Sequence, residues 1–223
     1  MTEARIVAEQ RDDSRSIPWL VVPEWRERFG VIAGITGRGD PESPFDLGLA
    51  SGEPTRAVMD RWRALRAAFP EATGIVVARQ VHGRKVLWHE SRDGWTIFEG
   101  ADGHATRAEG LLLAVSVADC IPIYLLDPTR RAVALLHSGW RGTAAGILAA
   151  GIDALVSRAG SRVGDLLLHA GVGICASCYE VSADVASACG RPAPDGAKVQ
   201  LDLRAVIVEQ ARAAGIGSGS VSP

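Results

Sequence analysis

The chain has 223 residues, of which 47% are hydrophobic and 22% are charged, and its formal net charge is −2. This is enough for one substantial hydrophobic core, so we expect a single domain over residues 1–223. The small, interspersed charge argues against a nucleic-acid partner or an anionic membrane surface. The N-terminus lacks a signal-peptide pattern, and no apolar run reaches the roughly 18 residues of a spanning helix. We therefore expect a soluble, cytoplasmic protein that is monomeric by default.

Helices are predicted from apolar periodicity and from the positions of proline and glycine. Proline interrupts residues 1–30, which predicts an irregular N-terminal segment before a short strand at 31–33. Pro54 opens a helix whose apolar face consists of Val58, Trp62, Leu65 and Phe69. Small residues predict a helix over 143–156, followed by a short helix within 181–188. Asp202 caps a last helix over 203–214, before a Gly- and Ser-rich tail.

Strands are predicted from apolar and β-branched runs bounded by turn residues. They are expected at 74–78, 85–88, 111–117, 121–126, 132–136 and 166–169. The strand at 85–88 is expected to pair back onto 74–78, and 111–117 to be covered on both faces. Residues 90–100 are predicted to be a turn-rich connector and 101–106 a polar turn in which Asp102 faces a cleft, while His89 and His104 are predicted on the surface.

Four cysteines are present, at positions 120, 175, 178 and 189. A chain of this length without secretion signals is expected to keep them as free thiols. Cys175 and Cys178 form a CxxC, but no second CxxC or nearby histidine accompanies it. We therefore predict a loop with two unpaired thiols at this motif.

Three potential metal ligands follow or precede predicted strands in glycine-flanked, polar contexts. They are His82 in Gln-Val-His-Gly, Cys120 in Ala-Asp-Cys, and His137 in His-Ser-Gly-Trp-Arg-Gly. Cysteine and histidine are the ligands that zinc prefers, and three dispersed ligands with an open fourth position are typical of a catalytic site. The same set also suits Cu²⁺. A thiol hydrolase with Cys120 as nucleophile, His137 as base and Asp119 as orienting acid stays open.

The neighbouring residues indicate anion and base binding. Arg141 stands at the start of a predicted helix, where an arginine and free backbone N–H groups can hold a phosphate. Trp140 can stack on a base or pack against the sheet. Arg38, in the glycine-punctuated loop 34–40, is a second candidate anion contact.

Taken together, the Gln80–Gly83, Ala118–Pro122 and His137–Thr143 motifs resemble those of the laccase-domain family, over about residues 28–214. Members have been called multicopper polyphenol oxidases and are now better described as enzymes that cleave purine nucleosides. The resemblance implies an α/β (α+β) fold, with a mixed β-sheet core flanked by helices. It also implies one zinc ion held by His82, Cys120 and His137.

The resemblance further implies phosphorolysis of adenosine, inosine and S-methyl-5′-thioadenosine, together with deamination of adenosine. A purine nucleoside and phosphate would be the small-molecule partners. We assign Asp119 as proton carrier, Arg141 and Arg38 as phosphate contacts, and Trp140 and Asp102 as substrate contacts. Three alternatives are a copper-dependent polyphenol oxidase, a peptidoglycan-editing hydrolase acting on a muropeptide precursor, and a domain that only binds nucleotide.

The chain departs from the family pattern at several positions. Val117 stands where the family has threonine, Thr36-Gly37-Arg38 where it has Ser-Thr-Arg, and Asp46 where it has asparagine. Members also continue past the last helix into a Cys-containing strand and an arginine-rich segment. The resemblance therefore predicts a C-terminus that is truncated relative to the family.

Overall fold

The computed structural model describes residues 9–49 and 52–222, and its largest element is a mixed sheet of six strands in the order β16-β13-β11-β12-β9-β7. The strands are β7 (Val86–His89), β9 (Gly103–Thr106), β11 (Ile121–Asp127), β12 (Ala132–Ser138), β13 (Leu167–Ala170) and β16 (Val221–Ser222). Neighbours are antiparallel except β7 with β9 and β13 with β16. The predicted mixed α/β class is confirmed, as are the strands expected at 121–126, 132–136 and 166–169.

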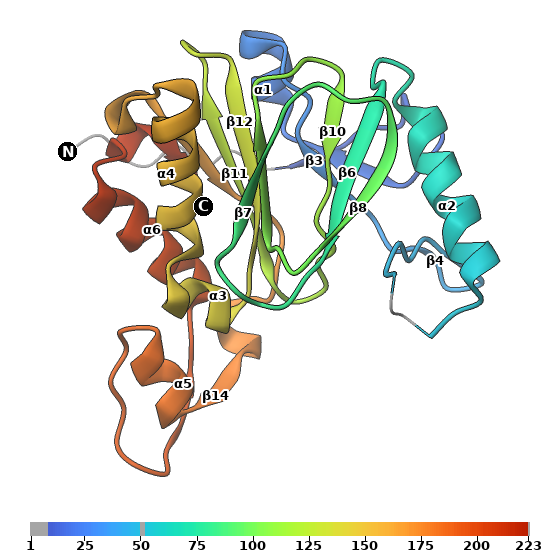
Figure 1. Ribbon diagram of the computed structural model, residues 1–223. Helices are drawn as coiled ribbons and strands as arrows, with labels where there is room; N and C mark the ends of the chain where they lie inside the picture. Colours follow the sequence, from blue (N-terminus) through green and yellow to red (C-terminus); the bar gives the residue numbers. More distant parts are fainter. Residues whose placement is uncertain (1–8, 50–51, 223) are drawn as a thin grey trace.

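Two helices, α4 (Ile147–Ala159) and α6 (Leu203–Ala214), cover one face of this sheet (Figure 1). Helix α6 has the predicted bounds, and its Asp202 cap accepts a hydrogen bond of 2.9 Å from the backbone N–H of Ala205. The single helix predicted at 143–156 is instead α3 (Trp140–Ala145) followed by α4. Gly146 separates the two because it adopts a left-handed φ of 84°.

A second, parallel sheet of three strands lies beside the first in the order β10-β6-β8. Its strands are β6 (Gly74–Arg79), β8 (Gly94–Glu99) and β10 (Leu111–Leu113). Helix α2 (Thr55–Ala68) covers it with the predicted apolar face, which packs against Ile75 and Val77. The period of the apolar residues alone was therefore sufficient to orient this helix.

Three strand predictions were wrong. The expected connector at 90–100 contains β8, which pairs with β6 along its whole length. Strand β7 does not fold back onto β6; it pairs with β9, inside the segment expected to be a turn. The strand expected at 111–117 ends at Leu113, and residues 111–117 are all half-buried rather than covered on both faces. Among the described strands β10 pairs with β6 alone, so no ladder on its second edge extends it.

The N-terminal segment covers the second face of the six-stranded sheet. It forms β1 (Gln10–Arg11), β2 (Trp19–Val21), α1 (Pro23–Phe29) and β3 (Gly34–Thr36). Val22, Trp25 and Ala33 pack there against Tyr124 and Leu126. The segment is thus more regular than expected, and the strand predicted at 31–33 is displaced to 34–36.

Short elements complete the described chain. They are β4 (Gly39–Asp40), β5 (Ser43–Pro44), β14 (Glu180–Ser182), α5 (Ala183–Ala188), β15 (Lys198–Gln200) and 3-10 turns at Val163–Asp165, Ala176–Cys178 and Ser218–Ser220. The α5–β14 region projects below α3 in Figure 1. None of the helices within residues 9–49 and 52–222 has both the length and the apolar character needed to cross a bilayer.

Candidate metal centre

The three predicted ligands come together at one end of the six-stranded sheet. One ligand atom each from His82, Cys120 and His137 lies within 4.8 Å of the other two. The two imidazole rings meet edge to face, with their centroids 4.8 Å apart. His137 is buried, Cys120 is half-buried and His82 is exposed, so the cluster opens to solvent on the His82 side.

The pairing of β11 with β12 brings two of these ligands together. Pro122 lies opposite His137 in the antiparallel register, which puts Cys120, just before β11, beside the turn that follows β12. Gly139 forms this turn. A Cβ at position 139 would lie 2.8 Å from the Cys120 sulfur and 3.3 Å from Cδ2 of His82. The glycine of the His-Ser-Gly-Trp motif therefore makes room for the ligands themselves.

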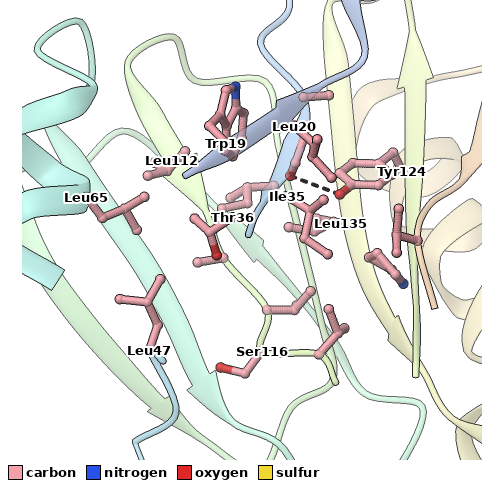
Figure 2. A pocket seen from close by; sticks show the side chains of 18 of the residues that line it. Trp19, Leu20, Ile35, Thr36, Leu47, Leu65, Leu112, Ser116, Tyr124 and Leu135 are labelled. Carbon is pink, nitrogen blue, oxygen red and sulfur yellow. Dashed lines mark hydrogen bonds between the residues drawn. The ribbon is translucent and has the colours of Figure 1, made fainter. Parts of the chain in front are cut away.

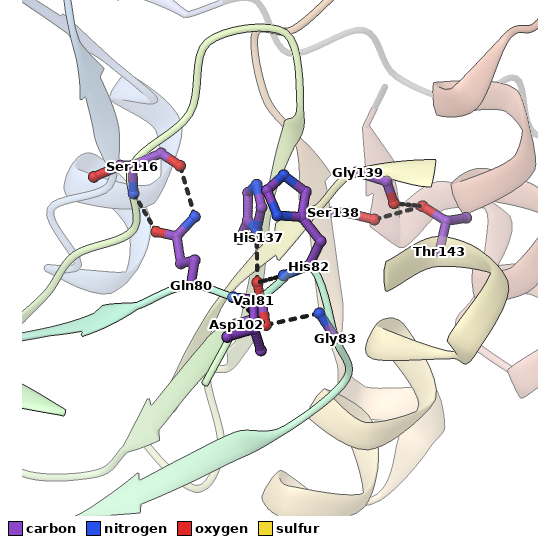
Figure 3. A network of polar contacts seen from close by, with 10 residues as sticks. All are labelled: Gln80, Val81, His82, Gly83, Asp102, Ser116, His137, Ser138, Gly139 and Thr143. Carbon is purple, nitrogen blue, oxygen red and sulfur yellow. Dashed lines mark hydrogen bonds and ion pairs between the residues drawn. The ribbon is translucent and has the colours of Figure 1, made fainter. Parts of the chain in front are cut away.

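The third ligand is held by a carboxylate beneath the cluster (Figure 3). His82 lies in a tight loop after β6, with a positive φ of 57°. The backbone N–H groups of Val81, His82 and Gly83 donate hydrogen bonds to the carboxylate of Asp102 over 3.2, 2.9 and 2.8 Å. These three bonds fix the loop in a conformation that a non-glycine residue adopts rarely.

Asp102 also contacts His137, whose Nδ1 lies 2.9 Å from its Oδ1. A hydrogen bond at one ring nitrogen fixes the tautomer and leaves Nε2 free for a metal, an arrangement typical of protein zinc sites. Asp102 is fully buried and all of these contacts are to protein donors. The structure therefore places it behind the ligands, whereas we had expected it to face a substrate cleft.

The protonation states follow from this geometry. Burial opposes a charge on Asp102, but hydrogen bonds from His137, Gly83 and Val81 outweigh it and keep the carboxyl pKa below its ordinary value. Burial lowers the pKa of His137, which keeps its imidazole neutral, as metal binding requires. Burial, then the charges of Asp119 and Asp102, raise the pKa of the Cys120 thiol. Cys120 is consequently a poor free nucleophile and needs a nearby cation to become a thiolate.

The donor set fits a zinc ion. Two imidazole nitrogens and one thiolate are common zinc ligands, and three protein ligands leave a fourth position open. In a tetrahedral site with ordinary Zn–N and Zn–S distances, the ligand atoms lie roughly 3.3–3.6 Å apart. The three ligand atoms here lie within 4.8 Å of one another, so they must move closer together to bind a zinc ion.

The other predicted residues occupy two separate places. Asp119 is exposed directly beside Cys120, and Arg141 is exposed at the start of α3, with its guanidinium 4.3 Å from the ring centroid of the half-buried Trp140. Within the described residues the Arg141 side chain makes no ion pair or hydrogen bond. Arg38 instead lies on an exposed loop at the edge of a cavity.

That cavity, of about 690 Å³, is lined mainly by apolar side chains between the two sheets (Figure 2). Trp19, Leu65, Leu112 and Leu135 contribute to its walls. Its lining includes residues 111–118 and Pro122, which flank Asp119 and Cys120 in the sequence. Its volume is in the range of small-molecule sites, roughly 300–1,000 Å³.

Two residues near the site had no predicted role. The side-chain amide of Gln80 accepts a hydrogen bond of 2.6 Å from the Ser116 N–H and donates one of 2.8 Å to the Ser116 carbonyl (Figure 3). It thereby links the cavity wall to the loop that carries His82. Tyr179 is half-buried and close enough to Cys120 and Arg141 for their charges to affect its pKa, which burial raises first of all. In the sequence, Tyr179 directly follows the CxxC motif.

The remaining histidines lie away from the cluster and are buried, contrary to the surface positions expected for His89 and His104. His89 Nε2 and His104 Nδ1 are 2.9 Å apart, on the adjacent strands β7 and β9. His169 Nδ1 lies 2.9 Å from the Ser222 hydroxyl. Strand β9 lies between β12 and β7, so its residues are buried even though their polar character predicted a surface turn.

Known proteins are similar to this chain in both sequence and fold. Purine nucleoside phosphorylase YlmD of Geobacillus stearothermophilus is 35% identical over 68% of this chain and 60% of that protein. Purine nucleoside phosphorylase ORF3 of Streptomyces griseus is 33% identical over 70% of this chain and 61% of that protein. The chain thus spans about six tenths of the length of these two relatives.

Two matches cover more of the chain. Adenosine deaminase RL5, from an unidentified prokaryote, is 30% identical over 97% of this chain and 87% of that protein. The crystal structure of YlmD from G. stearothermophilus superimposes with a TM-score of 0.84 at 27% identity, covering 98% of this chain and 87% of that one. The family model described as multi-copper polyphenol oxidoreductase laccase matches residues 33–222. The chain belongs to this laccase-like family.

Proposed function

We propose that this protein is a zinc-dependent purine nucleoside phosphorylase that also deaminates adenosine. The convergence of His82, Cys120 and His137 into one cluster that opens to solvent carries the proposal. The names of the relatives support a purine-processing enzyme: two are called purine nucleoside phosphorylase and one adenosine deaminase. The metal, the substrates and the division between the two reactions are our proposal, and they follow what the family resemblance implies.

In this proposal His82, Cys120 and His137 hold the metal and Asp102 orients the two histidines. A zinc ion there would supply Lewis-acid polarisation at its open position. Asp119 is exposed next to Cys120, and its carboxylate accepts and returns the proton that moves during either reaction. The adjacency of Asp119 to a ligand is the support for this role.

Phosphate binding is assigned to Arg141. Its guanidinium is exposed, has no anionic partner among the described residues and is positioned by the Trp140 ring. Such a free, preoriented arginine can bind phosphate through two hydrogen bonds. Arg38, at the cavity edge, is a second contact for the substrate, and the apolar cavity beside Ser116 and Val117 offers space for a purine base.

The alternatives fit these contacts less well. A multicopper oxidase needs several histidine-rich copper sites, but of the five histidines three form separate contacts: His89 with His104, and His169 with Ser222. A thiol hydrolase needs an activated cysteine, whereas burial raises the pKa of the Cys120 thiol.

Elemental analysis combined with adenosine turnover tests the proposal. We expect one equivalent of zinc, phosphate-dependent formation of adenine and ribose 1-phosphate, and phosphate-independent formation of inosine. Cys120→Ser should lose metal and both activities, and Cys175→Ser, which changes an exposed thiol outside the cluster, should keep them. Zinc-loaded protein that leaves adenosine unchanged with and without phosphate would contradict the proposal. Adenosine binding without turnover would then favour the domain that only binds nucleotide.

A further inference from the structure

The loop between β13 and β14 carries two thiols that the proposed reaction does not use. Cys175 and Cys178 are both free and exposed. The intervening residues form a tight turn, in which the Cys178 N–H donates a hydrogen bond of 3.0 Å to the Cys175 carbonyl. The backbone therefore brings the first and last residues of the motif together.

This turn suits a disulfide. A turn closed by an i to i+3 hydrogen bond keeps its end Cα atoms within about 7 Å of each other. Disulfides join residues whose Cα atoms are about 4.4–6.8 Å apart. The Cys175 sulfur also lies 3.3 Å from the Ser177 hydroxyl. The span of this turn falls within the range that a disulfide bridges, so closure requires little backbone movement.

The two thiols are chemically unequal. Hydrogen bonds from the Cys178 thiol and then from Ser177 lower the pKa of Cys175, whereas the same bond to Cys175 raises the pKa of Cys178. A thiolate is the attacking species in thiol–disulfide exchange. The Ser177 hydroxyl, 3.3 Å from the Cys175 sulfur, can also donate a hydrogen bond to a thiolate at position 175. On this contact we assign Cys175 as the nucleophile of the pair and Cys178 as the resolving thiol.

The other two cysteines are distinct from this pair. Cys120 is half-buried among the three candidate metal ligands. Cys189 is buried, and its sulfur lies 3.7 Å from the Trp140 carbonyl. The loop itself is anchored next to the cluster, because the Ile174 N–H donates a hydrogen bond of 2.9 Å to the Asp119 carbonyl. The reactive turn is thereby fixed at the protein surface without sharing a ligand with the metal.

We propose that Cys175 and Cys178 form a redox-active dithiol that exchanges with small-molecule disulfides such as oxidised glutathione. The Cys175 thiolate attacks one sulfur of the oxidant, forming a mixed disulfide and releasing one glutathione thiol. Cys178 then attacks the Cys175 sulfur and releases the second. Two protein thiols lose two electrons to the oxidant, and their two protons end on the two glutathione molecules.

Thiol counting and mass spectrometry test this proposal independently of any purine activity. The full chain is incubated with oxidised glutathione, its remaining thiols are blocked with a maleimide, and peptides are mapped. We expect two of the four thiols to be lost as a Cys175–Cys178 disulfide and recovered with dithiothreitol. Cys178→Ser should accumulate glutathione on Cys175, whereas Cys175→Ser should be modified at position 178 at least about tenfold more slowly.

Cys189→Ser is the matched control and should still form the disulfide. Three results would overturn the proposal: four free thiols after oxidation of the wild-type chain, a disulfide that includes Cys120 or Cys189, or equal rates of glutathione addition to the two single variants. The readout is covalent modification of exposed thiols, so loss of metal or of adenosine turnover would not affect it.

Discussion

Asp102→Asn should weaken metal binding although the side chain barely changes in shape. Oδ1 accepts hydrogen bonds from the His82 N–H and faces His137 Nδ1, and Oδ2 accepts from the Val81 and Gly83 N–H groups. An asparagine has one oxygen and must direct its NH₂ group toward donors on the other side. One orientation loosens the loop of His82 and the other releases His137, so a ligand is lost in either case.

The magnitude follows from the bonds removed. Two buried hydrogen bonds to a charged acceptor contribute about 1.5–3 kcal/mol each, so the free energy of unfolding should fall by about 3–6 kcal/mol. Loss of a partner that orients a ligand typically weakens metal affinity by about 10–100-fold. Urea denaturation of the metal-free protein measures the first effect and competition with a zinc chelator measures the second.

Asp195→Asn is a suitable control, because Asp195 is exposed and makes no hydrogen bond or ion pair within the described residues. It should match the wild type in both measurements. If Asp102→Asn also binds zinc with wild-type affinity and unfolds at the same urea concentration, the positioning role of Asp102 is refuted.

Three further changes probe other parts of the molecule. Gly139→Ala places a Cβ 2.8 Å from the Cys120 sulfur, so chelator competition should show at least about tenfold weaker zinc binding. An unchanged zinc affinity would mean that the turn accommodates a Cβ without displacing the ligands. Burial lowers the pKa of His89 to about 4 and of His104 to about 3, whereas both are near 6.5 when unfolded. As the pH falls below 6.5, the unfolded chain binds protons at these two residues before the folded protein does. The free energy of unfolding, measured by urea denaturation at each pH, should therefore fall by on the order of 5 kcal/mol between pH 7 and pH 4. Replacing both histidines with glutamine should reduce this dependence on pH. Arg141→Ala should raise the KM for phosphate by about 10–100-fold while adenosine deamination persists, and Arg212→Ala, an exposed arginine on α6, should change neither.

The fold was predictable where a local pattern carried the information. The helix over 203–214 was recognised from its cap and its apolar face, and β11 and β12 from continuous apolar runs. The partners of β7 and β8 were not predictable from local patterns. Each pairs in parallel with a strand distant in sequence, and parallel pairing leaves no hairpin signal between the two.

For the candidate site, the residue types were enough to predict the chemistry: two imidazoles and one thiol beside glycines, with an arginine at a helix start. Their surroundings depend on how the strands pair. The tertiary structure placed Asp102 beneath two ligands rather than in a cleft, and it buried His89 and His104 between strands. The physical reason is that residue type specifies which bonds a side chain can make, whereas non-local strand pairing determines which partners come within reach.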